Sequence, residues 1–586
     1  MATDEKQAGA ATGTIPSLED WQHMTLVMGR AQQMLMEAWA SGAAKDQPFP
    51  AWSPALGQFG AAGADPMALM TAGAEAWAKG LDAWSKMLGG VADAGQVRDK
   101  RFAATEWSDN PLFDTIRQSY LAISDRLLGS VEEIEGIDQA TRQKLRFATR
   151  SLVDAMSPSN FALTNPQVIA RTMETKGENL LSGLKNMLRD IGQGQVTQSQ
   201  PGAFELGRNL AMTPGKVIHE TPLYQLIQYA PTTQTVFETP VVIFPPWINR
   251  FYILDLTPEK SFVKWAVDEG ISLFMVSWKS ADEHSGDVML DDYVAAQIDA
   301  VDVIRDALGV ESVNAIGYCV AGTTLAATLA LLQARGEEAK VKSATFFTAQ
   351  VDFSEAGDLK LFLGDEAMGL LGQVTEGKGY LDGRYMAATF NLLRGRDLIW
   401  SYVVNNYLLG EEPTPFDMLH WNSDTTNLPA AWHRDYLETL YKGNKLVEKG
   451  GITVAGVPID LSTVKTPAYI QAGREDHIAP PESVWKILDH FTGETRFVLA
   501  GSGHIAGVVN PPAGGKYQYW INEGKPATLA EFIAGATEHK GSWWPDWVEW
   551  LRERAPKMVK ADGARVPGRG KRKAIEDAPG RYVRER

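Results

Sequence analysis

The only cysteine of the chain, Cys319, has the surroundings that a catalytic nucleophile requires. It lies in the sequence GYCVAG at 317–322, which follows an apolar run and opens a run rich in Ala and Leu. A strand that turns sharply into a helix exposes the residue at the turn, and small neighbours let the chain fold back on itself. Amide groups at the start of the helix favour the thiolate and donate to a developing oxyanion. We therefore expect Cys319 to be a nucleophile and the N–H of Val320 to be an oxyanion donor, although a free cysteine is usually a small buried hydrophobe.

An acid and a base are expected after later strands, in that order along the chain. The apolar run at 468–473 leads into REDH at 474–477, and the run at 496–500 leads into GSGH at 501–504. We assign Asp476 as the orienting acid and His504 as the base that takes the thiol proton. His477 adjoins the acid, which is a poor position for a base that this acid orients. We therefore expect His477 to stabilise the loop.

Composition excludes several other kinds of site. The nine histidines show no metal-ligand spacing, and there is no H-E-x-x-H, cysteine cluster or phosphate-loop signature, so we expect no metal and no cofactor. A single cysteine excludes disulfides within the chain, and residues 1–13 lack the apolar core of a secretory signal, which together favour the cytoplasm. A net charge of −16 disfavours nonspecific binding to nucleic acid.

The elements that must position these residues fall into two regions, because 586 residues exceed one compact core. Helical patterns dominate 1–200, where 1–13 and the Gly-, Ala- and Pro-rich stretch 41–65 are expected to be disordered. From 201 onward, apolar strands alternate with helical runs and are expected at 241–244, 273–278, 313–318, 344–348, 468–473 and 496–500. This alternation predicts a parallel sheet covered by helices on both faces. Residues 312–334 carry no charge, but their Asn, Gly, Thr and Gln residues indicate a buried strand, turn and helix, and no membrane span.

Two later segments break this alternation. Between 352 and 465 the strand pattern stops and Trp, Tyr and Leu become frequent, which we interpret as a cap inserted over the site, the alternative being one more helical layer. Aromatic residues such as Trp421 either line an apolar tunnel for substrate or form the core of this cap. From 552 to 586 the chain holds twelve Lys and Arg against five Asp and Glu. This excess predicts a solvated, partly disordered tail or, alternatively, a docking segment for an acidic partner.

Several long blocks of sequence resemble the class I, single-subunit polyhydroxyalkanoate synthases. The blocks are FELGRN at 204–209, PPWINRFYILDL at 245–256, SGHIAGVVNPP at 502–512, GSWWPDW at 541–547 and APGRYV at 578–583. The resemblance begins at about residue 99 and implies an α/β-hydrolase fold with an inserted cap, preceded by a mainly helical N-terminal domain. One departure is Ala321, where the family has glycine, and we expect this methyl group to tune the turn without abolishing it.

The resemblance also implies what the protein does. It implies that Cys319, His504 and Asp476 act on (R)-3-hydroxyacyl-CoA, with short acyl units such as 3-hydroxybutyryl-CoA favoured. It further implies a homodimer whose N-terminal domain lies at the surface of polyester storage granules, near phasin proteins.

We expect roles for three further residues. Arg394 resembles a family arginine near the CoA entrance, a surface ion pair being the alternative. Asp255 resembles a family aspartate, and we favour a structural hydrogen-bonding role for it. The second oxyanion donor is expected in the loop after the strand at 241–244, at the N–H of Ile248.

Cysteine suits polymerisation because moving an acyl group from CoA to a thiol exchanges one thioester for another and keeps its group-transfer potential. Attack by the 3-hydroxyl of another unit then gives an ester and drives elongation. One rival is a thioesterase or polyester depolymerase on the same fold, against which cysteine in place of serine argues. The other rival is a non-catalytic granule-coat protein, which the Met-rich pattern at 20–40 and the basic tail would suit.

Overall fold

The computed structural model describes residues 99–586 of the chain. The helix expected at 20–40 and the disorder expected at 1–13 and 41–65 lie outside the described residues. The chain forms two compact units, which we call the first and the second unit. The first unit comprises Met1–Gln198 with Arg394–Pro413, and the second comprises Ser199–Leu393 with Thr414–Arg586. Arg394–Pro413, which we had placed in the cap, therefore packs with the N-terminal helices.

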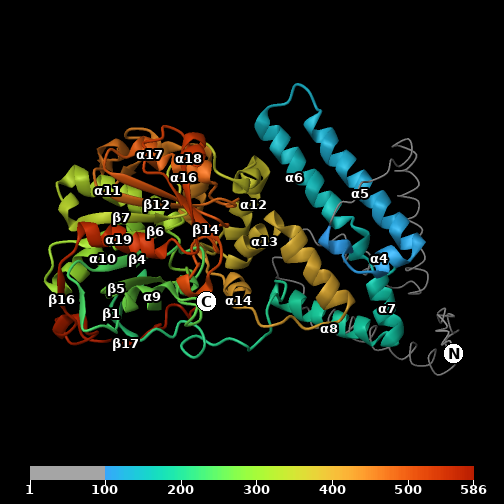
Figure 1. Ribbon diagram of the computed structural model, residues 1–586, viewed down its shortest axis with the longest axis horizontal. Helices are drawn as coiled ribbons and strands as arrows, with labels where there is room; N and C mark the ends of the chain where they lie inside the picture. The colour runs from blue at the N-terminus through green and yellow to red at the C-terminus, as the bar shows by residue number, and fades with distance from the viewer. Residues whose placement is uncertain (1–98) are drawn as a thin grey trace, which may run out of the picture. The chain divides into compact units, whose positions relative to one another are not determined.

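The described part of the first unit is helical (Figure 1), as the sequence predicts. Its helices are α4 (Glu106–Asp109), α5 (Pro111–Glu132), α6 (Gln139–Ala155), α7 (Pro166–Glu174) and α8 (Glu178–Gln193). Caps mark their starts: the side chains of Asn110, Asp138 and Asn165 accept from the first-turn amides of α5, α6 and α7. Proline occupies the first position of α5 and α7, where its missing N–H costs nothing.

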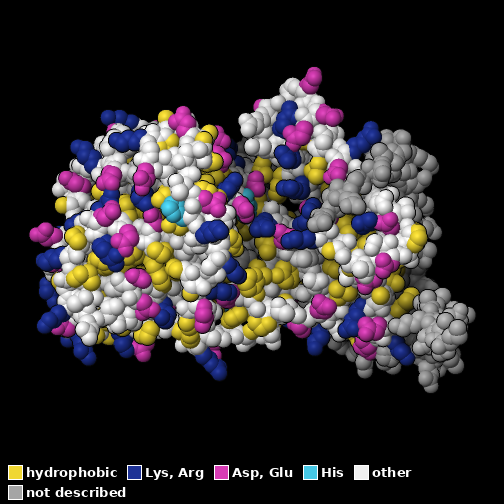
Figure 2. Space-filling model, viewed as in Figure 1, with side chains coloured by type: hydrophobic (Ala, Val, Ile, Leu, Met, Phe, Trp, Pro, Cys, Tyr) yellow, Lys and Arg dark blue, Asp and Glu magenta, His cyan; other side chains and the backbone are white. Residues whose placement is uncertain are grey.

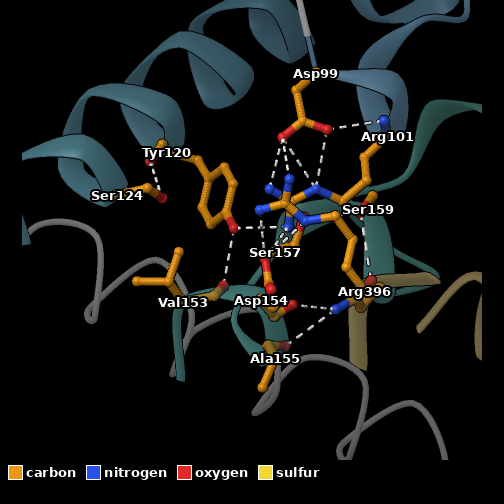
Figure 3. A network of polar contacts seen from close by, with 11 residues as sticks. Asp99, Arg101, Tyr120, Ser124, Val153, Asp154, Ala155, Ser157, Ser159 and Arg396 are labelled. Carbon is orange, nitrogen blue, oxygen red and sulfur yellow. Dashed lines mark hydrogen bonds and ion pairs between the residues drawn. The ribbon is translucent and has the colours of Figure 1, made fainter. Parts of the chain in front are cut away.

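Arg394–Pro413 is held in the first unit by side chains of these helices. Its two π-helical segments are Arg396–Trp400 and Val403–Leu408. Arg396 donates to Asp154, which also accepts from Arg101, in the polar network of Figure 3. Tyr407 donates to Asp190 on α8 at 2.7 Å. Such pairing between residues far apart in sequence leaves no local pattern, which is why the sequence did not indicate it.

The second unit is built on an eleven-stranded mixed sheet (Figure 1). Its six central strands are parallel and are the six that the sequence predicts: β4 (Val241–Phe244), β5 (Leu273–Trp278), β6 (Val313–Tyr318), β7 (Val341–Phe347), β12 (Ala468–Gly473) and β13 (Thr495–Ala500). Antiparallel strands extend both edges: β1 (Gly215–Glu220), β2 (Tyr224–Tyr229) and β17 (Glu576–Asp577) on one side, and β14 (Gln518–Ile521) and β15 (Thr537–Lys540) on the other. The sheet is therefore mixed: the six predicted strands are parallel, and antiparallel strands that the sequence did not indicate lie at both edges.

Helices cover both faces of this sheet. Both faces are apolar because successive side chains of each buried strand point to opposite sides. Val242 and Phe244 of β4 belong to one hydrophobic core, whereas Val241 and Ile243 belong to the other. The first core contains residues of α10 (Leu290–Leu308), α11 (Val320–Arg335), α16 (Pro481–Trp485), α17 (Ile487–His490) and α18 (Leu529–Gly535). The second core contains residues of α9 (Phe262–Asp268) and α19 (Trp544–Arg554). This strand order and layering is the α/β-hydrolase fold.

The segment expected to form the cap is mainly helical in the parts that belong to the second unit. It contains α12 (Asp365–Thr375), α13 (Gly383–Leu393), α14 (Asp417–Ser423), α15 (Ala430–Asp435) and a π-helical segment, Tyr436–Lys442. Two short antiparallel strand pairs are also present: β8 (Tyr380–Leu381) with β9 (Leu428–Pro429), and the hairpin of β10 (Thr453–Val454) with β11 (Val457–Pro458).

The basic segment after residue 552 is folded, so the prediction of a partly disordered tail is wrong. Its strand β16 (Met558–Lys560) pairs with β3 (Thr235–Phe237), and β17 pairs with β1. The guanidinium of Arg565 is buried and donates to two backbone carbonyls and to Ser272. Other basic side chains form ion pairs with the second unit, such as Lys571 with Asp306. Figure 2 shows the consequence, with positive and negative side chains interspersed over the visible face of this unit.

Candidate active site

Cys319 stands at a strained turn between β6 and α11. Its φ is +53° and its ψ is −127°, a backbone conformation that a non-glycine residue adopts only when the surrounding structure enforces it. The Cys319 amide donates to Phe347 O at 2.9 Å, which ties the turn to the end of the neighbouring strand β7. The side chain of Cys319 is half-buried. The turn therefore presents the thiol at the carboxyl edge of the parallel strands.

Two glycines make this turn possible. A Cβ atom on Gly317 would lie 2.5 Å from Cα of Gly322, and one on Gly322 would lie 2.4 Å from Cβ of Ala349. The close approach therefore joins the residues two before and three after Cys319. Ala321, by contrast, is fully buried in the core on the α11 side of the sheet, and its carbonyl accepts from Gln297. The methyl group that departs from the family pattern thus packs in the core, away from the glycine contact.

The structure brings Asp476 and His504 together beside this turn. Asp476 follows β12 and His504 follows β13, which is the adjacent parallel strand. Nδ1 of His504 lies 2.7 Å from Oδ2 of Asp476, whose side chain is fully buried. The other carboxylate oxygen of Asp476 accepts the amide hydrogens of Ile478 and Ala479 at 2.8 and 2.9 Å. These bonds fix the carboxylate, and the carboxylate in turn fixes the imidazole.

His504 lies close enough to Cys319 for the charge of the sulfur to act on the imidazole, so the three side chains share one site. Burial opposes protonation of His504, but the charges of Asp476 and Cys319 and hydrogen bonds to both raise its pKa well above the ordinary value. The phenol of Tyr318 donates to the His504 carbonyl at 3.2 Å, which anchors the loop that carries His504.

The two expected oxyanion donors lie on neighbouring elements. Val320 is the first residue of α11, so its N–H belongs to the first-turn amides that have no acceptor within the helix. Ile248 lies in the loop that follows β4, and Phe244 at the end of β4 is paired in register with Gly317, two residues before Cys319. The loop of Ile248 therefore starts beside the turn that carries the thiol. Whether the two amides act on a substrate oxygen stays a prediction.

Sequence reasoning missed a pair of phenols near the thiol. Tyr436 and Tyr441 are buried with their rings edge-on, the ring centroids lying 5.3 Å apart, and Gln350 donates to the Tyr441 hydroxyl at 3.2 Å. Burial and the nearby charge of Cys319 raise the pKa of both phenols, so they stay neutral donors. Both belong to the aromatic-rich segment 352–465, where nothing in the residue types separates them from ordinary core aromatics.

Asp255 and His477 have contacts within the fold. Asp255 is buried and accepts from the hydroxyls of Thr213 and Ser261, each at 2.6 Å. Burial raises its pKa to about 6, and these hydrogen bonds oppose the rise. The His477 carbonyl accepts from the Asp358 amide at 3.1 Å, which links the Asp476 loop to the start of the cap segment.

The polar contacts of the Trp421 and Arg394 side chains are with residues other than Cys319. Trp421 is buried in the core that α9 and α19 cover, and its indole N–H donates to Arg250 O at 2.7 Å. Arg394 belongs to the first unit, is exposed and forms an ion pair with Asp397, three residues on. The assignment of both residues to substrate binding stays a prediction. The contacts of Trp421 are those of a core residue, and that of Arg394 is a surface ion pair.

The described part of the chain lacks two further kinds of feature, a metal site and a membrane-spanning helix. Within residues 99–586, no group of three or more His, Cys, Asp or Glu side chains is arranged to hold a metal ion. None of the helices there is both long enough and apolar enough to cross a membrane.

Comparison with known proteins gives consistent matches over most of the chain. The profile described as "Poly-beta-hydroxybutyrate polymerase (PhaC) N-terminus" matches residues 98–266, and the alpha/beta hydrolase fold profile matches residues 277–511. The chain is 46% identical over 521 residues to "Poly(3-hydroxyalkanoate) polymerase subunit PhaC" of Rhizobium meliloti (strain 1021), covering 86% of this chain and 84% of that one. It is 49% identical to "Poly(3-hydroxyalkanoate) polymerase" of Methylorubrum extorquens, covering 83% and 80%. It is 43% identical to the PhaC subunit of Cupriavidus necator, covering 86% of each.

Proposed function

Because this chain belongs to the poly(3-hydroxyalkanoate) polymerase family, we propose that it polymerises (R)-3-hydroxyacyl-CoA into polyester and releases CoA through an acyl group bound to Cys319. The observation that supports the mechanism most strongly is the connected set Cys319, His504 and Asp476. Its thiol lies at a strained turn, and its imidazole is held 2.7 Å from a buried carboxylate. These are the parts that activation of a thiol nucleophile requires.

The first half-reaction loads the enzyme. His504 takes the proton of Cys319, and the thiolate attacks the thioester carbonyl of the substrate. The tetrahedral oxyanion is stabilised by the N–H groups of Val320 and Ile248. The carbon–sulfur bond to CoA then breaks, the CoA sulfur takes the proton from His504, and a new thioester to Cys319 remains. One thioester is exchanged for another, so little free energy is lost.

The second half-reaction lengthens the chain. The 3-hydroxyl of another acyl unit loses its proton to a base and attacks the acyl–Cys319 carbonyl, which forms an ester and frees the thiol. We assign this role to His504, because both oxygens of Asp476 are already engaged by His504 and by two backbone amides. Formation of an ester from a thioester is downhill and drives elongation.

The remaining parts of the proposal rest on family membership. We propose short acyl units such as 3-hydroxybutyryl-CoA as substrates, with no cofactor beyond the CoA that enters with substrate and leaves as product. We also propose a homodimer in the cytoplasm, associated with the granules that its product forms and near phasin proteins.

The rival activity is hydrolysis by a thioesterase or polyester depolymerase on the same fold. Incubation of the purified protein with (R)-3-hydroxybutyryl-CoA separates the two, because both release CoA but only the polymerase forms insoluble polyester. Polymer that accounts for the CoA released supports the proposal, whereas free 3-hydroxybutyrate as the sole product contradicts it. A Cys319→Ala variant serves as the control for catalysis: a non-catalytic granule-coat protein would show equal, background CoA release with and without the cysteine.

A further inference from the structure

We propose that Arg250 is a positioning residue, which ties the loop of the expected oxyanion donor to the closing segment of the chain. We call residues 245–250 the oxyanion loop and residues 576–586 the closing segment. The inference rests on the proposed function, because it assigns a purpose to the loop that carries Ile248. Neither element is joined to the other by sequence proximity, so the structure alone suggests the connection.

The Arg250 side chain is almost fully buried and donates to four acceptors, one of which is Thr425 O at 3.4 Å. Its side chain is 1% exposed, and that of Asp424 is 7% exposed. Nε of Arg250 donates to Asp424 at 3.1 Å, which compensates the buried charge. The two terminal nitrogens donate to Tyr582 O at 3.4 Å and to Glu585 O at 2.8 Å. One guanidinium therefore joins the oxyanion loop to Asp424 and to two carbonyls of the closing segment.

The backbone of the oxyanion loop is held at both ends by other side chains. Pro245 O accepts from the indole of Trp278 at 2.7 Å, and Arg250 O accepts from the indole of Trp421 at 2.7 Å. Between them, Trp247 O accepts from Thr426 at 2.6 Å. These three carbonyls of the loop are thus hydrogen-bonded within the protein. Among the contacts of the loop named here, only those of the Arg250 side chain reach the closing segment.

The closing segment is itself firmly placed, so it can serve as a fixed point. Its strand β17 pairs with β1 at the edge of the sheet. The Tyr582 amide donates to Gln225, and its hydroxyl donates to Thr221 O at 2.8 Å. Val583 is buried in the same hydrophobic core as Trp421. The carbonyls that receive the Arg250 guanidinium are therefore held by backbone pairing, hydrogen bonds and apolar packing together.

This arrangement bears on catalysis because Arg250 is two residues from Ile248. An oxyanion donor must be placed where the charge develops in the transition state, and displacement by about 1 Å can cost about a hundredfold in rate. Lysine cannot replace arginine here, because a single ammonium cannot reach Asp424 and two diverging carbonyls with the geometry of a planar fork. Loss of the fork should loosen the loop while leaving Cys319, His504 and Asp476 in place.

Two variants remove the connection from opposite sides. Arg250→Lys keeps the charge opposite Asp424 but loses the fork. A chain that ends at Arg581 removes the two accepting carbonyls but keeps arginine; it also removes Arg586, which pairs with Asp424, so Arg250→Lys is the decisive variant. Arg584→Ala is the matched control, since the Arg584 guanidinium donates to Leu206 O and its removal leaves both carbonyls in the closing segment. For each protein, kcat and KM for CoA release from 3-hydroxybutyryl-CoA are measured alongside the rate at which iodoacetamide alkylates Cys319. Alkylation develops no oxyanion, so it reports on the thiol and on folding but not on the loop.

The proposal predicts that kcat falls by about ten- to a hundredfold in both variants, with KM and the alkylation rate within about threefold of the parent and with Arg584→Ala unchanged. An unchanged kcat in Arg250→Lys overturns it. A parallel fall of kcat and alkylation in Arg250→Lys also overturns it, because the role would then be structural. Should the shortened chain fail to fold, Arg250→Lys alone decides. Hydrolysis in place of polymerisation by the parent would contradict the proposed function but not this inference, since both reactions pass through the same oxyanion.

Discussion

Nδ1 of His504 lies 2.7 Å from Oδ2 of Asp476, and the second oxygen of that carboxylate accepts two backbone amides. The two residues follow adjacent parallel strands, so the sheet itself sets their separation. Because Nδ1 faces the carboxylate, the other ring nitrogen is available to Cys319. The carboxylate thus selects the tautomer that can accept the thiol proton.

Replacing Asp476 with asparagine should lower kcat by roughly three orders of magnitude. The amide keeps the size of the side chain, but it removes the charge that stabilises the imidazolium and permits the wrong tautomer. CoA release from 3-hydroxybutyryl-CoA measures the effect. Glu475→Gln is the control, because Glu475 is exposed and adjacent in sequence. Equal losses in the two variants would mean that Asp476 has no special role.

His504→Gln should slow alkylation of Cys319 by iodoacetamide at pH 7 by about tenfold or more. Burial opposes protonation of His504, but its charged neighbours raise its pKa above the ordinary value, so the imidazole readily holds the proton that activation of Cys319 must remove. His477→Gln, one residue after the acid, is the matched control and should alkylate at the parent rate. Alkylation of His504→Gln at the parent rate would show that the imidazole does not activate this thiol.

The glycine contact beneath Cys319 predicts opposite outcomes at two neighbouring positions. Gly317→Ala should destabilise the fold by about 1–3 kcal/mol and lower activity, since its Cβ would fall 2.5 Å from Cα of Gly322. Ala321→Gly should leave the turn intact, because Ala321 packs in the core and not against this contact. Urea unfolding and CoA release measure both changes. Tolerance of Gly317→Ala would contradict the tightness of the turn.

Asp255 should make stability fall as pH rises. Its pKa is raised from 3.8 in the unfolded chain to about 6 in the folded protein, so the folded state binds the proton more tightly. The stabilisation is complete below pH 4 and is lost as pH rises through 6, a change of roughly 3 kcal/mol. As pH rises over this window, the unfolding free energy of Asp255→Asn should therefore increase relative to that of the parent. A difference that is flat between pH 4 and 7 would contradict the raised pKa.

The central sheet and the candidate site were predictable from sequence because their signals are local. Runs such as 313–318 are buried on both faces and therefore read as continuous apolar strands. Cys319, Asp476 and His504 were found because each directly follows such a run. The antiparallel strands beyond β13 were not predicted, because β15 is short and polar and its pairing partner β14 is only partly buried.

Other features depend on contacts that sequence does not display. The basic segment 552–586 has the composition of a disordered tail, yet backbone pairing of β17 with β1 and burial of Arg565 give it structure. Trp421 could be a tunnel or a core residue by type, and only its bond to Arg250 O and its burial show where it packs. The pair Tyr436 and Tyr441 is likewise visible only once the fold brings it near Cys319.

The most direct test of the account is to find the acyl group on Cys319. A rapid acid quench after mixing with 3-hydroxybutyryl-CoA, followed by digestion and mass spectrometry, measures which residue carries the acyl unit. The account predicts one or more 3-hydroxybutyryl units on the peptide that contains Cys319, removable by hydroxylamine and absent from the Cys319→Ala variant. Rapid release of CoA by the parent with the Cys319 peptide unmodified throughout the time course would contradict it.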